Sequence, residues 1–448
     1  MNSEIKWFER PLGEVTCNHD GKRKPVKESE RKKGPYPYYG ASGIVDYVDG
    51  YLFDGRYLLI AEDGENLRTR QTPIAFMADG KFWVNNHAHI VTGKEEVTTE
   101  YLHYFLQHAD VQSYLTGAVM PKLTQGNLNR IPVRYPEPDY QKQIVQILSS
   151  LDRKIDLNRH INQTLEAMAQ AIFKSWFVDF APVKAKIAAI EQGEDPLRAA
   201  MRAISGKTDA ELDQMPREHH DQLAATAALF PDAMEESELG EIPKGWKVGS
   251  VDDLCISITS GGTPARKNAE YWENGAIPWF KTGELLDGPL MDSEEHITES
   301  ALKGSSAKLW PAGTILFALY ASPTVGRLGV LTCSGASNQA AAGLVAKQQY
   351  GVPFLKRVLL CAREKLQNIA VGAAQQNINQ GILKSHRVIV PSGELATAYS
   401  KHVATADEQQ TQLAHQSRTI AEIRDPLLPK LLSGELRVPD IEHITEEV

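Results

Sequence analysis

The feature that most constrains this sequence is a long internal repeat. Much of the pattern from Gly117 to Phe180 recurs near the C-terminus after a constant offset of 255 residues, and no gap is needed to align the two copies. The matched pairs include Gly117 with Gly372, Gly126 with Gly381, Pro136 with Pro391, Asp152 with Asp407 and Phe177 with Leu432. A period of about half the chain indicates two large units rather than a solenoid of short ones. We therefore expect a tandem duplication.

A stretch without glycine or proline from Asp139 to Asp179 predicts a long helix in the first copy. Its apolar residues recur at alternating spacings of four and three, the heptad pattern of a helix that packs on another helix. The first seam consists of Ile144, Leu148, Leu151, Ile155, Asn158, Asn162, Leu165, Ala169, Ile172 and Trp176. The same offset gives the second seam: Tyr399, Val403, Ala406, Gln410, Leu413, Ser417, Ile420, Arg424, Leu427 and Leu431.

Both seams have polar centres, with Asn158 and Asn162 in the first and Gln410 and Ser417 in the second. We expect the two helices to pack on each other, with the polar residues fixing the register at some cost in stability. One buried helix in each of two separate domains is the alternative. At 1.5 Å per residue, forty residues span roughly 60 Å, which suggests a spacer.

Composition indicates a soluble globular protein, with 42% hydrophobic and 23% charged residues, and the length predicts about three domains. The sequence has no apolar N-terminal segment and no apolar run of about eighteen residues, so we expect no membrane segment. The four cysteines are far apart and form no CxxC pair. This pattern favours a reduced, cytoplasmic compartment and argues against a zinc site.

The formal net charge of −9 is unevenly distributed. Residues 1–135 carry 17 basic and 17 acidic side chains, and residues 241–391 carry 15 and 12. Acidic residues dominate residues 181–240, with 12 against 6 basic ones, and residues 392–448, with 10 against 5. The acidic balance of the whole chain therefore does not exclude nucleic acid as a partner of the two large modules.

The first module combines basic, aromatic and amide side chains with turn-forming residues. Seven basic residues lie between Lys22 and Lys33, a cluster typical of phosphate contact, although a solvated loop has the same composition. Three tyrosines follow within residues 34–43, and β-type runs are expected at residues 44–48, 57–61 and 82–91. The predicted nucleic-acid contacts are Lys22, Arg23, Lys24, Tyr36, Tyr38, Ser42, Asn86 and His87.

The second module follows a similar plan. Strands are expected at residues 256–259 and 314–320, and the polar turn Ser337–Ala340 resembles Asn85–Ala88 of the first module. Turn-forming residues place polar side chains on the surface, where they can reach phosphates or bases. The predicted contacts are Thr263, Arg266, Lys267, Lys281, Ser322, Thr324, Arg327, Asn338 and Gln339.

Two junction segments, Met120–Asn127 and Gln375–Ile382, connect each module to its long helix. Their polar residues either contact nucleic acid or cap helices and fix the angle of the module, and both interpretations stand. The residues concerned are Lys122, Thr124, Gln125, Gln375, Gln376 and Asn379.

Patterns that would suggest chemistry are incomplete. Ser205–Thr208 resembles the end of a phosphate-binding loop, but Met201 stands where glycine is required and no apolar strand precedes it. His87 and His89 lack a cysteine or carboxylate partner at a recognised metal-ligand spacing. Glu30–Lys32 matches the end of a nuclease signature but lies in a hydrophilic loop. There is no Asn/Asp-Pro-Pro-Tyr/Phe tetrapeptide for amino-methyl transfer, so we predict no catalytic residue and no metal site.

Several short motifs occur in a fixed order within this duplicated plan. They are Tyr38–Gly43, Leu52–Gly55, Asn158–Asn162 with Leu165-Glu166, Gly261–Pro264 with Tyr271-Trp272, and Ile277–Trp279 with Gly283-Glu284. Together they resemble the specificity subunits of bacterial and archaeal Type I restriction-modification enzymes. The resemblance covers nearly the whole chain except residues 181–240.

The resemblance implies an α+β fold in which two similar β-rich target-recognition domains are separated by two long antiparallel helices that form a coiled coil. The whole is a pseudo-twofold tandem repeat. The expected divisions are a first target-recognition domain at 1–135, a central long helix at 136–180, an acidic connector at 181–240, a second target-recognition domain at 241–391, a C-terminal long helix at 392–432 and a tail at 433–448.

The resemblance also implies function. Each domain would read one half of a split double-stranded DNA target, while two methyltransferase subunits and two restriction or motor subunits assemble on this chain. S-adenosylmethionine, ATP and Mg²⁺ would bind to those partners, and this chain would hold no cofactor. Two other hypotheses remain: a single-chain DNA methyltransferase with unrecognised motifs, and an assembly scaffold that does not contact DNA.

Overall fold

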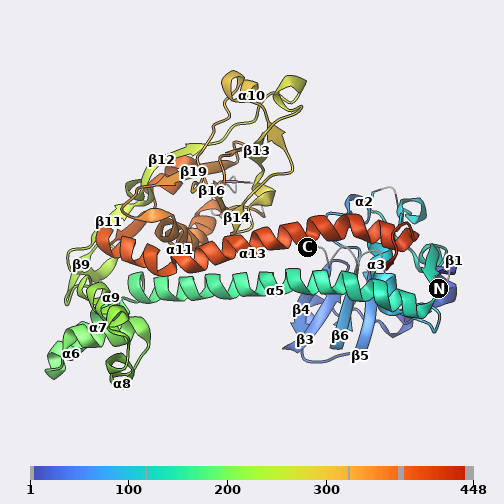
Figure 1. The fold of residues 1–448 in the computed structure, drawn as a ribbon, viewed down its shortest axis with the longest axis horizontal. Coiled ribbons are helices and arrows are strands. Elements are labelled where there is room, and N and C mark those ends of the chain that lie inside the picture. The colour runs from blue at the N-terminus through green and yellow to red at the C-terminus, as the bar shows by residue number, and fades with distance from the viewer. Residues whose placement is uncertain (1–4, 118, 321–322, 372–377, 439–448) are drawn as a thin grey trace. The chain divides into compact units, whose positions relative to one another are not determined.

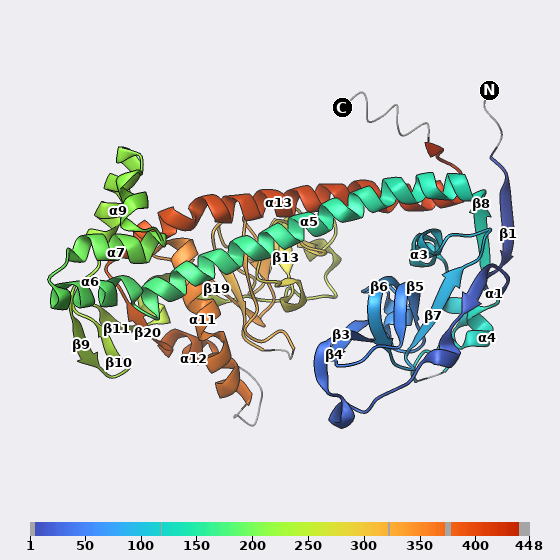
Figure 2. The same ribbon diagram turned by 90° about the horizontal axis from the view of Figure 1, so that it is seen from below.

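A computed structural model describes residues 5–117, 119–320, 323–371 and 378–438 (Figure 1; Figure 2). The chain forms two compact units. The first consists of residues 1–156 and 418–448, and the second of residues 157–417. Both long helices pass through this division, so each unit contains one end of each helix.

The first unit is built around a six-stranded sheet. Its elements, up to the first long helix, are β1 (Trp7–Pro11), α1 (Leu12–Val15), β2 (Thr16–Asn18), β3 (Lys33–Gly40), β4 (Gly43–Val48), β5 (Phe53–Ala61), α2 (Asn66–Thr69), β6 (Ala75–Val84), β7 (Ala88–Gly93), α3 (Thr99–His108), α4 (Gln125–Leu128), β8 (Pro132–Pro136) and α5 (Pro138–Phe177). The strand order is β2-β7-β5-β6-β3-β4. All pairs are antiparallel except β3 with β6. Leu58 and Ile60 of β5 are buried against Tyr101 and Leu102 of α3, which gives this unit its main core.

The second unit contains a helical segment, a five-stranded sheet, a three-stranded sheet and two separate strand pairs. Its helices are α6 (Ala181–Gln192), α7 (Pro196–Ser205), α8 (Asp209–Asp213), α9 (Arg217–Ala228), α10 (Glu299–Gly304), α11 (Gly351–Val371), α12 (Gln380–Ser385) and α13 (Gly393–Ser433). Its strands are β9 (Met234–Ser237), β10 (Gly240–Pro243), β11 (Lys247–Ser250), β12 (Cys255–Ser260), β13 (Ile277–Phe280), β14 (Pro289–Leu290), β15 (His296–Ile297), β16 (Ile315–Ala318), β17 (Leu328–Leu331), β18 (Ala336–Ser337), β19 (Ala341–Ala346) and β20 (Arg387–Val390). The larger sheet has the order β12-β19-β16-β17-β14 and the smaller one β15-β13-β18.

The tandem repeat is confirmed in the topology. In each unit an N-terminal strand pairs antiparallel with the strand that precedes a long helix: β1 with β8, and β11 with β20. The strands β8 and β20 are related by the 255-residue offset. The order β2-β7-β5-β6 in the first sheet also corresponds to β12-β19-β16-β17 in the second.

The long helices pair in antiparallel fashion within each unit (Figure 1). In the first unit, Arg424 near the end of α13 donates from Nη1 to Asp152 Oδ1 at 2.6 Å. In the second, the Tyr399 hydroxyl near the start of α13 donates to the Ala169 carbonyl at 2.9 Å. None of the predicted seam positions, all of which are described, is exposed. The predicted coiled coil is therefore confirmed.

The polar centre of the seam is hydrogen-bonded between the helices. Asn158 Nδ2 donates to Gln416 Oε1 at 2.9 Å and to Ser417 Oγ at 3.2 Å. Asn162 and Gln410 each donate a side-chain amide to the other's backbone carbonyl at 3.2 Å. These partners meet in only one alignment of the helices, so they select the register.

A buried ion network connects α11 with both long helices. The Arg357 side chain is fully buried and bonds Asp407 Oδ1 at 2.6 Å and Glu166 Oε2 at 3.0 Å. Lys356 Nζ lies 2.7 Å from the same Glu166 oxygen. Burial alone would raise the pKa of Glu166, but the charges of Lys356 and Arg357 outweigh it and hold that pKa below its ordinary value.

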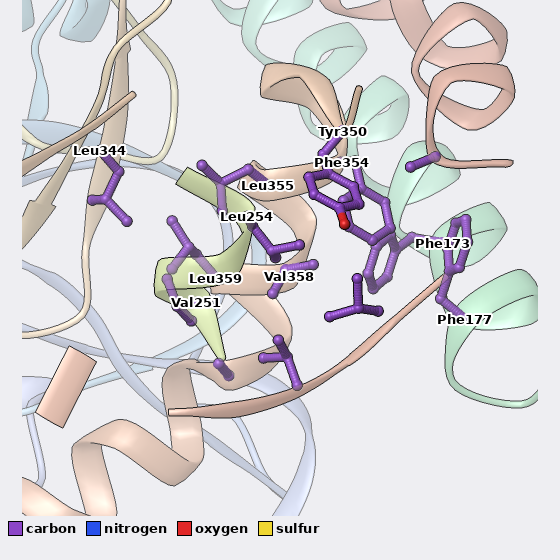
Figure 3. Packing of buried hydrophobic residues seen from close by; sticks show 14 of the residues in the cluster. Phe173, Phe177, Val251, Leu254, Leu344, Tyr350, Phe354, Leu355, Val358 and Leu359 are labelled. Carbon is purple, nitrogen blue, oxygen red and sulfur yellow. The ribbon is translucent and has the colours of Figure 1, made fainter. Parts of the chain in front are cut away.

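Aromatic side chains join the same three helices in the largest core (Figure 3). The rings of Phe173 and Phe177 of α5 lie 5.6 and 5.1 Å from that of Phe354 of α11. Both also contact Tyr399 of α13. In the first unit, Leu431 and other apolar residues at the end of α13 belong to the core against which Trp7 packs.

Residues 181–240 contain four helices and β9, which forms a hairpin with the following strand β10. The resemblance of Ser205–Thr208 to a phosphate-binding loop has a structural explanation. Gly206, with φ of +69°, terminates α7, and Thr208 caps α8 in a reciprocal capping box with Glu211. The glycine and the hydroxyl therefore serve two helix ends.

The expected β-type run at residues 82–91 forms two strands separated by the polar turn noted at Asn85–Ala88. The strand β6 ends at Val84 and β7 begins at Ala88. Asn85 makes the turn, since its Oδ1 accepts from the His87 amide at 2.8 Å.

The Arg357 network gives a stability prediction. An Arg357→Ala change leaves Asp407 and Glu166 partly buried without their main partner, so the free energy of unfolding of the second unit should fall by roughly 3–5 kcal/mol. Urea unfolding followed by tryptophan fluorescence measures this change. Arg217→Ala, which alters a 95% exposed arginine in the same unit, is the matched control and should have little effect. A loss no larger than that of the control would contradict a stabilising role for the network.

Candidate nucleic-acid interface

In the first unit, three clusters that are distant in sequence meet at Glu62 and Asp63, which directly follow β5. Arg23 Nη1 lies 2.6 Å from Glu62 Oε2, and Lys122 Nζ lies 3.2 Å from Glu62 Oε1. His87 Nδ1 lies 2.8 Å from Asp63 Oδ2. The basic loop, the Asn85–His87 turn and the helix junction therefore form one continuous edge of the module.

A buried histidine, His89, supports this edge from the interior of the module. His89 is 1% exposed, and its ring lies between the carboxylate of Asp20 (Nδ1 to Oδ2, 2.6 Å) and the carbonyl of Leu123 (Nε2 to O, 2.7 Å). The Ile90 amide donates to the other Asp20 oxygen at 2.8 Å. Burial opposes ionisation of Asp20, but these hydrogen bonds and the charge of Arg23 hold its pKa below the ordinary value. His89 thereby ties the helix junction to the sheet.

The predicted residues of the first unit divide into exposed and structural groups. Arg23 is mostly buried and also donates to the Ala88 carbonyl at 2.9 Å. Tyr38 is 1% exposed, and its hydroxyl accepts from the Val26 amide at 3.0 Å. Both hold the module together. Tyr36 is partly buried, and the exposed candidates are Lys22, Lys24, Ser42, Asn86, His87 and Lys122.

The junction residues show a capping role at equivalent positions. Thr124 Oγ1 accepts from the Asn127 amide at 3.3 Å and caps α4. Asn379 Oδ1 accepts from the Ile382 amide at 2.8 Å and caps α12. These two residues are related by the repeat offset. Ser322, Gln375 and Gln376 lie outside the described residues.

In the second unit, Gln339 occupies the corresponding edge. Its Oε1 accepts from Thr263 Oγ1 at 2.5 Å, and its carbonyl accepts from the Tyr320 hydroxyl at 2.7 Å. The neighbouring Thr324 and Arg327 are partly buried on one turn, where the Arg327 amide donates to the Thr324 carbonyl at 2.9 Å.

Two basic candidates of this unit, Arg266 and Lys281, form ion pairs with the same acidic residue, Glu295. Arg266 forms an ion pair with Glu295, and its guanidinium carbon lies 3.9 Å from the centroid of Trp272. Lys281 Nζ lies 3.2 Å from Glu295 as well. Lys267 is exposed beside them. The aromatic face and the carboxylate hold Arg266 in a fixed orientation.

The same backbone arrangement underlies both edges. The Glu62 amide donates to the His87 carbonyl at 2.9 Å, and its carbonyl accepts from Leu123 at 2.7 Å. In the second unit Leu319 makes the matching bonds to Ala340 and Ile378, both at 2.8 Å.

The turns also match, because Asn338 Oδ1 accepts from the Ala340 amide as Asn85 does from His87. The sequence comparison aligned Asn85 with Ser337. The structure corrects this alignment by one residue, because the side chain equivalent to that of Asn85 is that of Asn338. Sequence reasoning missed Glu62, Asp63 and Tyr320 at these edges, although their position just after buried strands was a usable signal.

The described residues offer neither a metal site nor a membrane-spanning helix. Among the residues that the structure describes, no group of three or more His, Cys, Asp or Glu side chains is placed to hold a metal ion. In the same part of the chain, none of the helices combines the length and the apolarity needed to cross a membrane.

A family model described as the Type I restriction modification DNA specificity domain matches residues 4–167 and 243–417. The chain belongs to this family. The HindI specificity subunit of Haemophilus influenzae is 31% identical over 403 residues, which cover 86% of this chain and 84% of that protein. The MjaIX specificity subunit of Methanocaldococcus jannaschii is 25% identical over 454 residues, which cover 96% of this chain and 93% of that protein. The chain is thus a DNA-recognition specificity subunit.

A solved structure supports the fold of this specificity subunit. The crystal structure of a Type I restriction-modification S subunit from M. genitalium matches with a TM-score of 0.53 and 14% identity. The match covers 96% of this chain and 97% of that one. The duplicated arrangement is therefore shared over the full length, whereas most side chains differ.

The buried Asp20 gives a pH-dependent prediction. A carboxylate whose pKa is lowered by folding stabilises the protein above its ordinary pKa of 3.8 and loses that contribution as the pH falls through the lower folded value. Asp20→Asn should therefore lower the stability of the first unit by about 1–3 kcal/mol at pH 7. The difference from the wild type should shrink below pH 3.8. Urea unfolding across this range measures both effects, with the exposed Asp54→Asn as control. A difference independent of pH would refute the ionic role of Asp20.

Proposed function

We propose that this specificity subunit reads a bipartite double-stranded DNA target, with residues 1–135 and 241–391 as two target-recognition domains that each bind one half-site. The observation that carries this proposal is the repeated edge, in which one backbone framework presents Asn86 and His87 in the first unit and Gln339 in the second. A shared backbone framework that carries different side chains is suited to two domains that recognise different DNA sequences.

The exposed residues of each edge suggest two kinds of DNA contact, to phosphates and to bases. Phosphate contacts position a protein on DNA, and contacts to base edges specify the sequence. Lys22, Lys24 and Lys267 are suited to phosphates, whereas the amides of Asn86 and Gln339 are suited to adenine edges in the major groove. Arg23 and Tyr38 support the surface from inside.

We infer that the chain itself is not catalytic and that its partners perform the chemistry. Because the helix and module pattern occurs twice, a subunit that recognises one copy finds a second copy on the same chain. This pattern fits two methyltransferase subunits and two restriction or motor subunits, which would bind S-adenosylmethionine, ATP and Mg²⁺. Incubation of the isolated chain with DNA and labelled S-adenosylmethionine tests the inference. Methyl transfer without any partner would contradict it.

The phosphate assignment predicts a change in salt dependence. Replacing Lys22 and Lys24 with alanine, while keeping the structural Arg23, should weaken DNA binding and lower the slope of log affinity against log salt by about 0.9 per lost contact. Titrations at several salt concentrations measure this slope. Lys184→Ala with Lys207→Ala removes the same charge from the helical segment and should leave the slope unchanged. Equal slopes for both double variants would refute the assignment.

The paired helices predict the spacing of the half-sites. One heptad inserted after Leu165 and another after Glu408 would lie opposite each other, keeping Asn162 with Gln410 and Glu166 with Asp407 on their present sides. The coiled coil would lengthen by roughly 10 Å, which corresponds to about three base pairs. Methylation mapping should show the same two half-sites with a longer spacer. An unchanged spacer would mean that the helices do not set the distance.

A further inference from the structure

The loop between Thr116 and Lys122 presents two bare apolar side chains at its tip. Val119 is 94% exposed, the highest fraction among the large hydrophobic residues that the structure describes, and the adjacent Met120 is 63% exposed. Single exposed apolar residues are common on protein surfaces. Two adjacent apolar side chains with such high exposure call for a physical reason.

Polar contacts fix the base of this loop. Thr116 and Lys122 exchange backbone hydrogen bonds of 2.8 and 2.7 Å, and the Gly64 amide donates to the Pro121 carbonyl at 3.1 Å. Arg68 Nη2 donates to the Gly117 carbonyl at 2.9 Å. All of these contacts are made to the backbone of the loop, and the side chains of Val119 and Met120 remain exposed.

Glycine is required at the start of the loop. Gly117 has φ of +87°, and a Cβ there would lie 2.2 Å from the Met120 carbonyl oxygen. The chain therefore turns back on itself in a conformation that other residues rarely adopt. This close approach fixes where Met120 lies relative to the base of the loop.

The tip adjoins the proposed DNA edge of the first unit. Lys122, whose side chain is 49% exposed, closes the loop and pairs with Glu62. Asp63 forms a β-bridge with Lys122 and holds His87, whose side chain is 51% exposed. An apolar tip beside a cation and polar side chains is the arrangement used by proteins that insert a side chain between base pairs while holding the backbone.

We propose that the Val119–Met120 tip inserts between adjacent base pairs of the half-site bound by the first module. This inference rests on the proposed reading of DNA. The sequence of the second copy has Ala374 and Gln375 at the matching positions. The insertion therefore belongs to the first half-site alone, so only that half-site is unstacked on binding.

The test uses the full-length chain and a duplex carrying its methylation-mapped target, with 2-aminopurine placed at successive positions. Wild-type protein should raise the fluorescence at one step of one half-site, because an unstacked 2-aminopurine is brighter. Val119→Ser with Met120→Ser should abolish this rise and weaken binding by roughly tenfold. The salt slope should stay unchanged, because no phosphate contact is lost. Lys122→Ala should instead lower the slope.

Control variants distinguish insertion into DNA from the alternative explanations of the exposed tip. Ile190→Ser removes a half-exposed apolar side chain from α6 and should change neither affinity nor fluorescence. Wild-type-like binding and fluorescence of the double variant would overturn the insertion. Loss of methyltransferase assembly with unchanged DNA binding would also overturn it and make the tip a protein-docking site. Absence of specific binding by the wild-type chain would overturn the proposed function together with the insertion.

Discussion

Burial of the apolar seam shared by α5 and α13 is the interaction on which the rest of the structure depends. A helix of about forty residues obtains most of its stability from packing rather than from intrinsic propensity. Each compact unit contains the start of one long helix and the end of the other. Neither unit is therefore complete without both helices, although their sequences are separated by more than 200 residues.

Polar groups give this packing its register. An all-apolar seam would tolerate sliding by a heptad, whereas the bonds from Asn158 to Gln416 and Ser417 form in one alignment only. Arg357 adds a second constraint, because it requires Glu166 of α5 and Asp407 of α13 at the same place. The polar centre thus lowers the stability of the packing somewhat and in return defines one pairing of the helices.

The sequence predicted the parts of the fold that repeat. The offset of 255 residues located both long helices, and their heptad spacing identified seam positions that are all buried or partly buried. Local sequence patterns predicted the contacts at the edges of the modules less well. Arg23 was predicted from its place in a basic cluster, but its partner Glu62 lies 39 residues away and becomes visible only when the sheet forms. Tyr38 was predicted from a turn-rich segment, but the strand pairing directs it into the core.

The two modules share backbone hydrogen bonds but few side chains, so the recognition surface varies while its support stays constant. The central claim is that this surface reads two separate half-sites. The most direct measurement is methylome sequencing of the source cell with and without this gene. The account predicts that one bipartite methylated motif, with two defined halves around unspecified bases, disappears when the gene is removed. An unchanged methylome, or the loss of a single uninterrupted motif, would contradict it.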